Sequence, residues 1–265
     1  MTIGKTNSSV IRGIDRANQS LQKSFTRLSS GSRINKASDD AAGLAIVSAL
    51  EADAATSRVA SRNAVDAQSF LDIQQQTTSQ LSEINVRQQE LAIQASNGTL
   101  SDEQRASLDQ EFQALSAEAA RITSSAEFNG VKVFGSQVNV QVGNDSSGDS
   151  TISTQNLSSA ELTSQGLSIA DSSSALASLD SLKQAQSNIA QANSSIGAVQ
   201  SRLSRAEDLS ETKRLGSLTA ASRIRDADVA EEVANTVAAN TRLQIDTALN
   251  AQSNLNAGAV LRLLK

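Results

Sequence analysis

The chain has 265 residues, a formal charge of −5, and no Cys, His, Trp, Tyr or Pro. Without His or Cys it has no imidazole base, no thiolate nucleophile and no nitrogen- or sulfur-ligated zinc site, so we expect neither an enzyme nor a cofactor. The mild acidity argues against a nucleic-acid partner. The chain contains no run of about 18 apolar residues, so we expect no membrane span.

Hydrophobic residues make up 38% of the chain, but many are Ala, and the only aromatic residues are five Phe. A thick globular core needs larger side chains, whereas Ala, Ser, Gln and Leu suit slender helices packed side by side. The first residues, MTIGKTNSSVIRGIDRANQS, lack a continuous apolar core. We therefore expect no Sec-type signal peptide, and export would need another route.

The first predicted element is an amphipathic helix that ends near Gly31. Its apolar residues recur at spacings of three and four, which is typical of one helical face. They are Val10, Ile14, Ala17, Leu21, Phe25 and Leu28. The segment GSRINKASDD is expected to form a loop, with Ser38 as the N-cap of the next helix and Asp39 and Asp40 favouring the dipole of that helix.

A second, long helix is predicted from about Asp39 to Ala95, because apolar residues again recur at steps of three and four. Asn97-Gly98 is expected to end it. Ser101 and Gln104 have the spacing of a capping box and predict the start of a third helix.

Beyond residue 130 the apolar period changes to two. Val131–Phe134 and Val138–Val142 alternate apolar and polar residues and predict a β-hairpin, with a further strand near Thr151–Thr154. Residues 143–175 are rich in Ser, Thr, Gly and Asp and predict a short surface-exposed variable segment. It would be either a plain solvated loop or a carrier of glycans.

The C-terminal third returns to helical periods. Large and small apolar residues alternate in a heptad that lets two helices approach closely. They are Leu182, Ala185, Ile189, Ala192, Ile196, Val199, Leu203 and Ala206. After Gly216 the apolar residues recur in multiples of four, which predicts a stripe that winds around its helix.

These patterns predict a mainly α fold: a long-helix hairpin with a coiled-coil core and rod and a small β-hairpin segment, in which the two chain ends come together. The expected parts are an N-terminal core helix (1–37), a helical rod with the β-hairpin (38–142), the variable segment (143–175), a C-terminal rod helix (176–222) and a C-terminal core helix (223–265).

The terminal segments have apolar stripes but could bury little between just two helices. We infer that their burial comes mainly from identical neighbours, which give a filament when a head-to-tail contact does not close. The predicted polymerisation residues are Val10, Ile14, Leu21, Leu28, Val229, Val233, Val237, Ile245, Leu249, Leu261 and Leu264. The alternatives are coiled-coil packing within one chain and, for the Leu-rich C-terminus, a frayed helix end.

The two ends also differ in charge. Residues 1–45 are basic, whereas Asp226, Asp228, Glu231 and Glu232 cluster at the start of the last helix. Opposite charge could set the register between the paired ends. Alternatively, the acidic residues complement the dipole of that helix.

Five motifs, in order, resemble those of bacterial flagellins: TRLSSGSRINKASDDAAGLAIV (26–47), RQQELAIQASNGTLSDEQRASLDQEF (87–112), EFNGVKVF (127–134), NSSIGAVQSRL and SRIRDADVAEEV. The resemblance covers nearly all of residues 1–142 and 176–265. The outer variable domains of larger members are essentially absent, the tail lacks the usual proline, and Val229 replaces a common tyrosine.

The resemblance implies a structural subunit that self-assembles into the extracellular flagellar filament for swimming motility. It also implies export in unfolded form through the flagellar type III apparatus. The implied partners are further copies of the chain, an export chaperone, the cap and the hook-filament junction proteins.

Some flagellins are sensed by a host Toll-like receptor, and the matching positions here are Arg87, Leu91 and Glu111, with Glu90 alongside. Arg would supply planar donors and Leu an apolar anchor. The alternative is that these residues mainly serve contacts between subunits.

Four charged residues flank the first loop: Arg27, Arg33, Asp39 and Asp40. They could form ion pairs between subunits, or they could belong to a solvated loop with capping carboxylates. For the whole chain, the competing hypotheses are a hook-filament junction protein of the same superfamily and a helical adaptor that does not polymerise.

Overall fold

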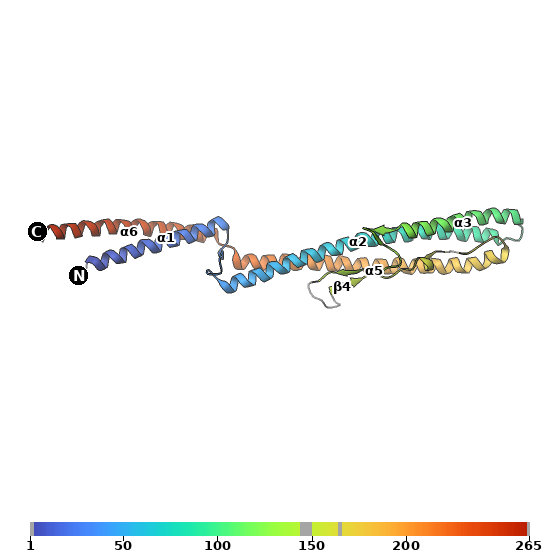
Figure 1. Cartoon of the computed structure of the whole chain (residues 1–265), viewed down its shortest axis with the longest axis horizontal. Coiled ribbons are helices and arrows are strands. Elements are labelled where there is room, and N and C mark those ends of the chain that lie inside the picture. Colours follow the sequence, from blue (N-terminus) through green and yellow to red (C-terminus); the bar gives the residue numbers. More distant parts are fainter. Residues whose placement is uncertain (1–2, 144–149, 164–165, 264–265) are drawn as a thin grey trace. The chain divides into compact units, whose positions relative to one another are not determined.

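The structure is a computed structural model that describes residues 3–143, 150–163 and 166–263 (Figure 1). Helices dominate these ranges, which confirms the predicted mainly α fold. The elements are α1 (Ile3–Ser30), α2 (Ala41–Ala95), α3 (Asp102–Ser125), β1 (Glu127–Phe128), β2 (Val131–Lys132), β3 (Asn139–Gln141), β4 (Thr151–Ser153), α4 (Ser159–Leu162), α5 (Ser172–Arg225) and α6 (Val229–Leu263). Among the helices described, none is long and apolar enough to cross a membrane.

The chain divides into two compact units. The terminal unit combines residues 1–52 with residues 216–265, and the central unit is the continuous segment 53–215. In the terminal unit α1 packs against α6. The prediction that the two chain ends come together is therefore confirmed.

The core of the central unit follows the predicted helical periods. Leu182, Ile189, Ile196 and Leu203 of α5 are almost completely buried, which confirms the heptad of large residues. Small residues such as Ala192 are buried between them. Because the small positions alternate with the large ones, neighbouring helices pack closely along the seam.

The helix starts agree with the sequence at one position and differ at another. Ser101 accepts a hydrogen bond from the Gln104 backbone, and the Gln104 side chain accepts one from the Ser101 backbone, so the predicted capping box of α3 is confirmed. Ser38 is not the N-cap of α2. The helix begins later, at Ala41, and the Asp40 carboxylate accepts a hydrogen bond from the Gly43 N–H at 2.8 Å instead.

The predicted hairpin between Val131–Phe134 and Val138–Val142 is wrong. Strand β2 instead pairs with β1, and β3 pairs with β4. Asn129 and Gly130 both have positive φ angles, 50° and 78°, which makes them the two-residue turn between β1 and β2. The strand expected near Thr151–Thr154 is present as β4.

The prediction that residues 143–175 form a surface-exposed segment is wrong at five apolar positions. Ile152, Leu157, Leu162, Ile169 and Ala175 are all buried in the central unit. Their burial could not be predicted from the Ser- and Thr-rich sequence, because they lie five to seven positions apart and follow no helical or strand period. Within its described residues, the segment therefore covers the core rather than leaving it.

Candidate functional site

The paired helices α1 and α6 run antiparallel. Arg27 near the end of α1 contacts Glu232 near the start of α6, while Gly13 lies against Asp246 further along α6. Among the residues whose burial is described, α1 and α6 bury only small or polar ones: Ala17, Ser24, Glu232 and Ala239. The expectation that two terminal helices bury little between them is therefore confirmed.

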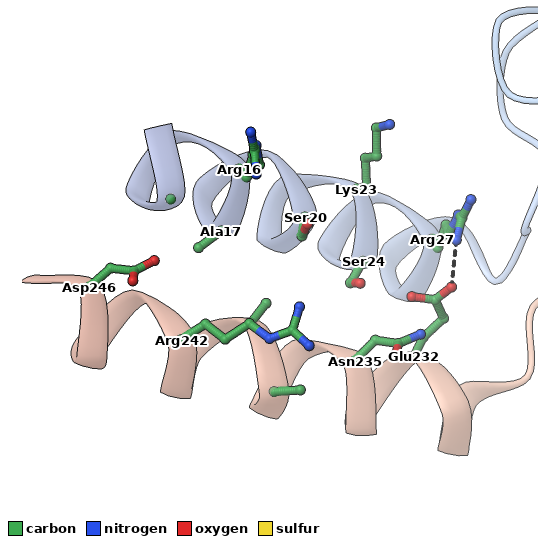
Figure 2. A pocket seen from close by; sticks show the side chains of 13 residues that line it. Arg16, Ala17, Ser20, Lys23, Ser24, Arg27, Glu232, Asn235, Arg242 and Asp246 are labelled. Carbon is green, nitrogen blue, oxygen red and sulfur yellow. Dashed lines mark hydrogen bonds and ion pairs between the residues drawn. The ribbon is translucent and has the colours of Figure 1, made fainter. Parts of the chain in front are cut away.

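An ion pair fixes one end of this seam. The Arg27 guanidinium donates a 2.8 Å hydrogen bond to Glu232, whose side chain is only 7% exposed (Figure 2). Burial by itself would raise the pKa of Glu232. Favourable contacts with Arg27, Ser24 and Asn235 outweigh it, and the pKa lies below its ordinary value. Opposite charge therefore fixes the two helices at this point.

Among the described residues, the other acidic residues of the cluster form no ion pair with α1. Asp228 accepts hydrogen bonds from the backbone N–H groups of Ala230 and Glu231, so it caps α6. Asp226 accepts a hydrogen bond from Ser222. Charge pairing with α1 and complementation of the helix start thus both occur, each through a different residue.

A polar groove of about 450 Å³ lies along the seam of α1 and α6. Its charged lining is mainly cationic, with Arg16, Lys23, Arg27 and Arg242 against Glu232 and Asp246. Figure 2 shows Arg242 pointing from α6 toward α1, while Arg16 and Lys23 extend from α1 away from α6. A β-carbon on Gly13 would lie 2.6 Å from the Asp246 carboxylate, so a larger residue at this position would have to displace the Asp246 side chain.

The loop after α1 is bound to the turn before α6. The Arg33 backbone N–H donates to the Arg225 carbonyl at 2.6 Å, and the Ala227 N–H donates to the Gly31 carbonyl at 2.9 Å. The Arg33 guanidinium donates to the Ile224 carbonyl at 2.8 Å. Arg225 also forms an ion pair with Glu51.

The carboxylates of the loop act on their own backbone. Asp39 accepts hydrogen bonds from the N–H groups of Asn35 and Lys36, each at 3.1 Å, and these bonds lower its pKa. Asp40 caps α2. Among the residues that the structure describes, Arg27 is the one member of the predicted loop set with an ion pair. Pairing of Arg27, Arg33, Asp39 and Asp40 between subunits stays a prediction.

The predicted polymerisation residues fall into two groups. On α1, Val10, Ile14, Leu21 and Leu28 are half-buried. On α6, Val229, Val233, Val237, Ile245 and Leu249 are between 47% and 60% exposed. Leu264 and the side chain of Leu261 lie outside the described residues.

Phe25 does not lie on the helical face predicted for it. Its side chain is 58% exposed, while its neighbour Ser24 is buried against α6. A heptad through Ala17, Ser24 and Leu28 places Ser24 on the face of α1 that packs against α6. The prediction assigned Phe25 to that face instead, because Phe is the larger apolar residue. Ile11, 48% exposed, is a second apolar surface residue that the sequence did not single out.

The predicted receptor-contact residues lie in the central unit. Arg87 donates hydrogen bonds to Glu111 at 3.0 and 2.7 Å and to Glu90 at 3.0 Å, and all three side chains are about half exposed. Leu91, in contrast, is only 1% exposed and packs near Phe112. Its predicted role as an apolar anchor for a partner is wrong, because the helical face that carries it points into the core.

Residues 5–139 match the family model for the bacterial flagellin N-terminal helical region, and residues 179–264 match that for the C-terminal helical region. A flagellin of Halalkalibacterium halodurans is 33% identical, with 92% of each chain covered. The flagellar filament 33 kDa core protein of Treponema phagedenis is 30% identical, with 96% of each covered.

Two solved structures share the fold. The crystal structure of Bacillus cereus flagellin matches with a TM-score of 0.51 and 25% identity, over 56% of this chain and 88% of that one. The structure of a flagellar hook-associated protein from Vibrio parahaemolyticus matches with a TM-score of 0.61 over 71% of this chain and 100% of that one. Its identity is 14%, so this likeness concerns the fold alone.

Proposed function

Because the chain belongs to the bacterial flagellin family, we propose that its copies assemble through the terminal unit into a flagellar filament outside the cell. The observation that carries this proposal is the exposed apolar stripe of α6, from Val229 to Leu249. A single chain leaves these side chains in water, although α1 is available to cover them. A second copy is the partner that the family relationship suggests.

The packing of α1 against α6 supports the same conclusion. The seam between them holds small and polar residues, while larger apolar residues such as Phe25 and Val237 face outward. Burying such a side chain contributes roughly 1.5–3 kcal/mol. Contact with other copies would therefore stabilise the terminal unit more, through burial of apolar side chains, than the packing of α1 against α6 does.

Seeded elongation tests the proposal. Purified protein is added to filament fragments, and filament length is measured by electron microscopy. We expect long filaments from the wild type. The double variant Val233→Ser/Val237→Ser should raise the critical concentration by about tenfold or more, because it removes about 1.4 kcal/mol or more of contact energy.

Ala248→Ser/Ala251→Ser is the matched control, because it places two Ser on the exposed surface of the same helix and removes little apolar area. Absence of elongation by the wild type would contradict the proposal. Short rings in place of filaments would favour the hook-filament junction protein. A protein that stays monomeric with intact ends would be the non-polymerising adaptor.

We further propose that the chain is exported unfolded through the flagellar type III apparatus, with an export chaperone, and that it is added beneath a cap beyond the hook-filament junction proteins. Family membership supports this route. Secretion into the medium by cells with and without an active flagellar export gate tests it. Equal secretion by both would contradict it.

Recognition by a host Toll-like receptor is proposed for the exposed ion-pair cluster of Arg87, Glu90 and Glu111, without Leu91. Arg87→Ala should lower the response of reporter cells that express the receptor. Arg121→Ala is the control, because Arg121 is also exposed and also paired with an acidic residue of its own helix. An equal response to both variants would leave the cluster with a role in subunit contacts alone.

A further inference from the structure

Five of the exposed apolar residues of α1 and α6 form two groups at different heights along the helix pair. One group is Phe25 on α1 with Val229 and Val233 on α6, and it lies near the Arg27–Glu232 ion pair. The other group, Ile245 and Leu249, lies near the position where Asp246 meets Gly13. Sixteen residues separate Val233 from Leu249, which corresponds to about 24 Å along the helix.

The two groups also lie on opposite sides of the helix pair. Successive residues of an α-helix turn by about 100°, so a spacing of four residues drifts by about 40° at each step. Glu232 and Ala239 are buried against α1 and define the inner face of α6. Relative to that face, Val229 and Val233 lie on one flank, Val237 lies at the back, and Leu249 reaches the other flank.

The flanks differ in charge. The flank of Leu249 also carries Arg242 and continues into the cationic groove. The flank of Phe25 and Val233 holds uncharged positions, which by the same helical geometry are Ile11, Asn18 and Gln22 on α1 and Thr236, Asn240 and Leu243 on α6. Contact between two groove flanks would bring cations together, whereas contact between unlike flanks does not.

Resting on the proposed function, we propose that Phe25, Val229 and Val233 of one copy contact Ile245 and Leu249 of a second copy that is displaced along the helix axis by about 24 Å. The two patches are different surfaces, so the contact is head-to-tail and leaves one patch free at each end. The winding stripe of α6 thereby sets both the neighbour and the axial displacement between copies.

Cross-linking tests this pairing against a clean background, because the chain has no cysteine. Val233→Cys and Leu249→Cys are prepared separately, mixed in equal amounts and grown from wild-type seeds. The filaments are then treated with a bifunctional maleimide shorter than about 10 Å. We expect cross-linked dimers in the mixed filament and at least tenfold fewer in filaments of either variant alone.

Thr247→Cys mixed with Leu249→Cys is the matched control. Thr247 lies on the same flank as Val233 and is exposed, but its height differs from that of Leu249 by only about 3 Å, so the proposed displacement would place the two cysteines about 21 Å apart along the axis. Dimers from this pair, dimers from Val233→Cys alone, or no dimers in well-formed filaments would overturn the proposed displacement while leaving filament assembly intact. Val229→Cys with Ile245→Cys repeats the measurement at the same spacing of sixteen residues.

Discussion

At the scale of single residues, Glu232 shows that position decides what a charge does. Four acidic residues cluster around the start of α6, and no sequence pattern distinguishes the one that forms the ion pair. Only Glu232 faces α1, so only its side chain is buried and paired with Arg27. Its neighbour Glu231 is exposed. The cluster could be predicted from composition, but the paired member depends on the rotation of α6 about its own axis.

Replacement of Glu232 should loosen α1 from α6. Glu232→Gln removes the counter-charge of Arg27, and we expect local opening to become easier by about 1–2 kcal/mol, with amide exchange in α1 and α6 about 5–30 times faster. Hydrogen–deuterium exchange at neutral pH measures this. Glu231→Gln is the matched control and should leave exchange unchanged; equal effects of the two variants would contradict the prediction.

The same pair predicts a dependence on acidity. The pKa of Glu232 is lower in the folded chain than in the unfolded chain, so the stabilisation is present above the ordinary Glu value of about 4.3. It is lost as the pH falls through the lower, folded value. Helical content followed by circular dichroism should therefore fall more steeply on acidification for the wild type than for Glu232→Gln. Parallel curves would contradict this.

At the scale of elements, the periodicity of apolar residues and the capping residues predicted the helices well. The alternating pattern predicted the pairing of the strands poorly. A capping box such as Ser101 with Gln104 is a local signal, and the structure retains it. An alternating segment, in contrast, indicates a strand but not its partner. The Asn129-Gly130 turn was the available signal, because it favours a hairpin of the residues immediately on either side of it.

Burial predicts different effects for two phenylalanines, Phe112 in the central unit and Phe25 in the terminal unit. Phe112 is fully buried between α3 and its neighbours, so Phe112→Ala should lower the free energy of unfolding by about 3–5 kcal/mol. Phe25→Ala, at an exposed site, should change it little yet impair filament growth. Urea unfolding of the monomer and seeded elongation separate the two effects. Equal destabilisation by both variants would contradict the assignment.

At the scale of the whole molecule, the pairing of the chain ends could be predicted, because both ends carry apolar stripes and a β segment lies between them. Which side chains remain in water could not. Leu91 and Val237 both belong to helical apolar series, yet one is buried and the other is 60% exposed. The difference in exposure depends on how many helices pack around each position. A periodic pattern shows which face of a helix is apolar, but it does not show how many other helices cover that face.

Removal of residues 223–265 should separate folding from assembly. The described hydrophobic core of the central unit takes no residue from this segment, so the shortened chain should stay soluble and keep its cooperative unfolding transition. It should also fail to elongate seeds, because α6 and its exposed stripe are gone. Analytical ultracentrifugation and electron microscopy test both points, and normal filaments from the shortened chain would refute assembly through the terminal unit.

The make-up of the terminal unit has a consequence for the order of folding. Arg27 and Glu232 are 205 positions apart in the chain, whereas the central unit is one continuous segment. Closing so long a loop in an unfolded chain is entropically costly, and the cost falls once the intervening residues have collapsed. The central unit is therefore expected to fold first. A new subunit would then form the exposed apolar surface of its terminal unit last. By that time its central unit is folded and no longer exposes unfolded chain to a neighbouring copy.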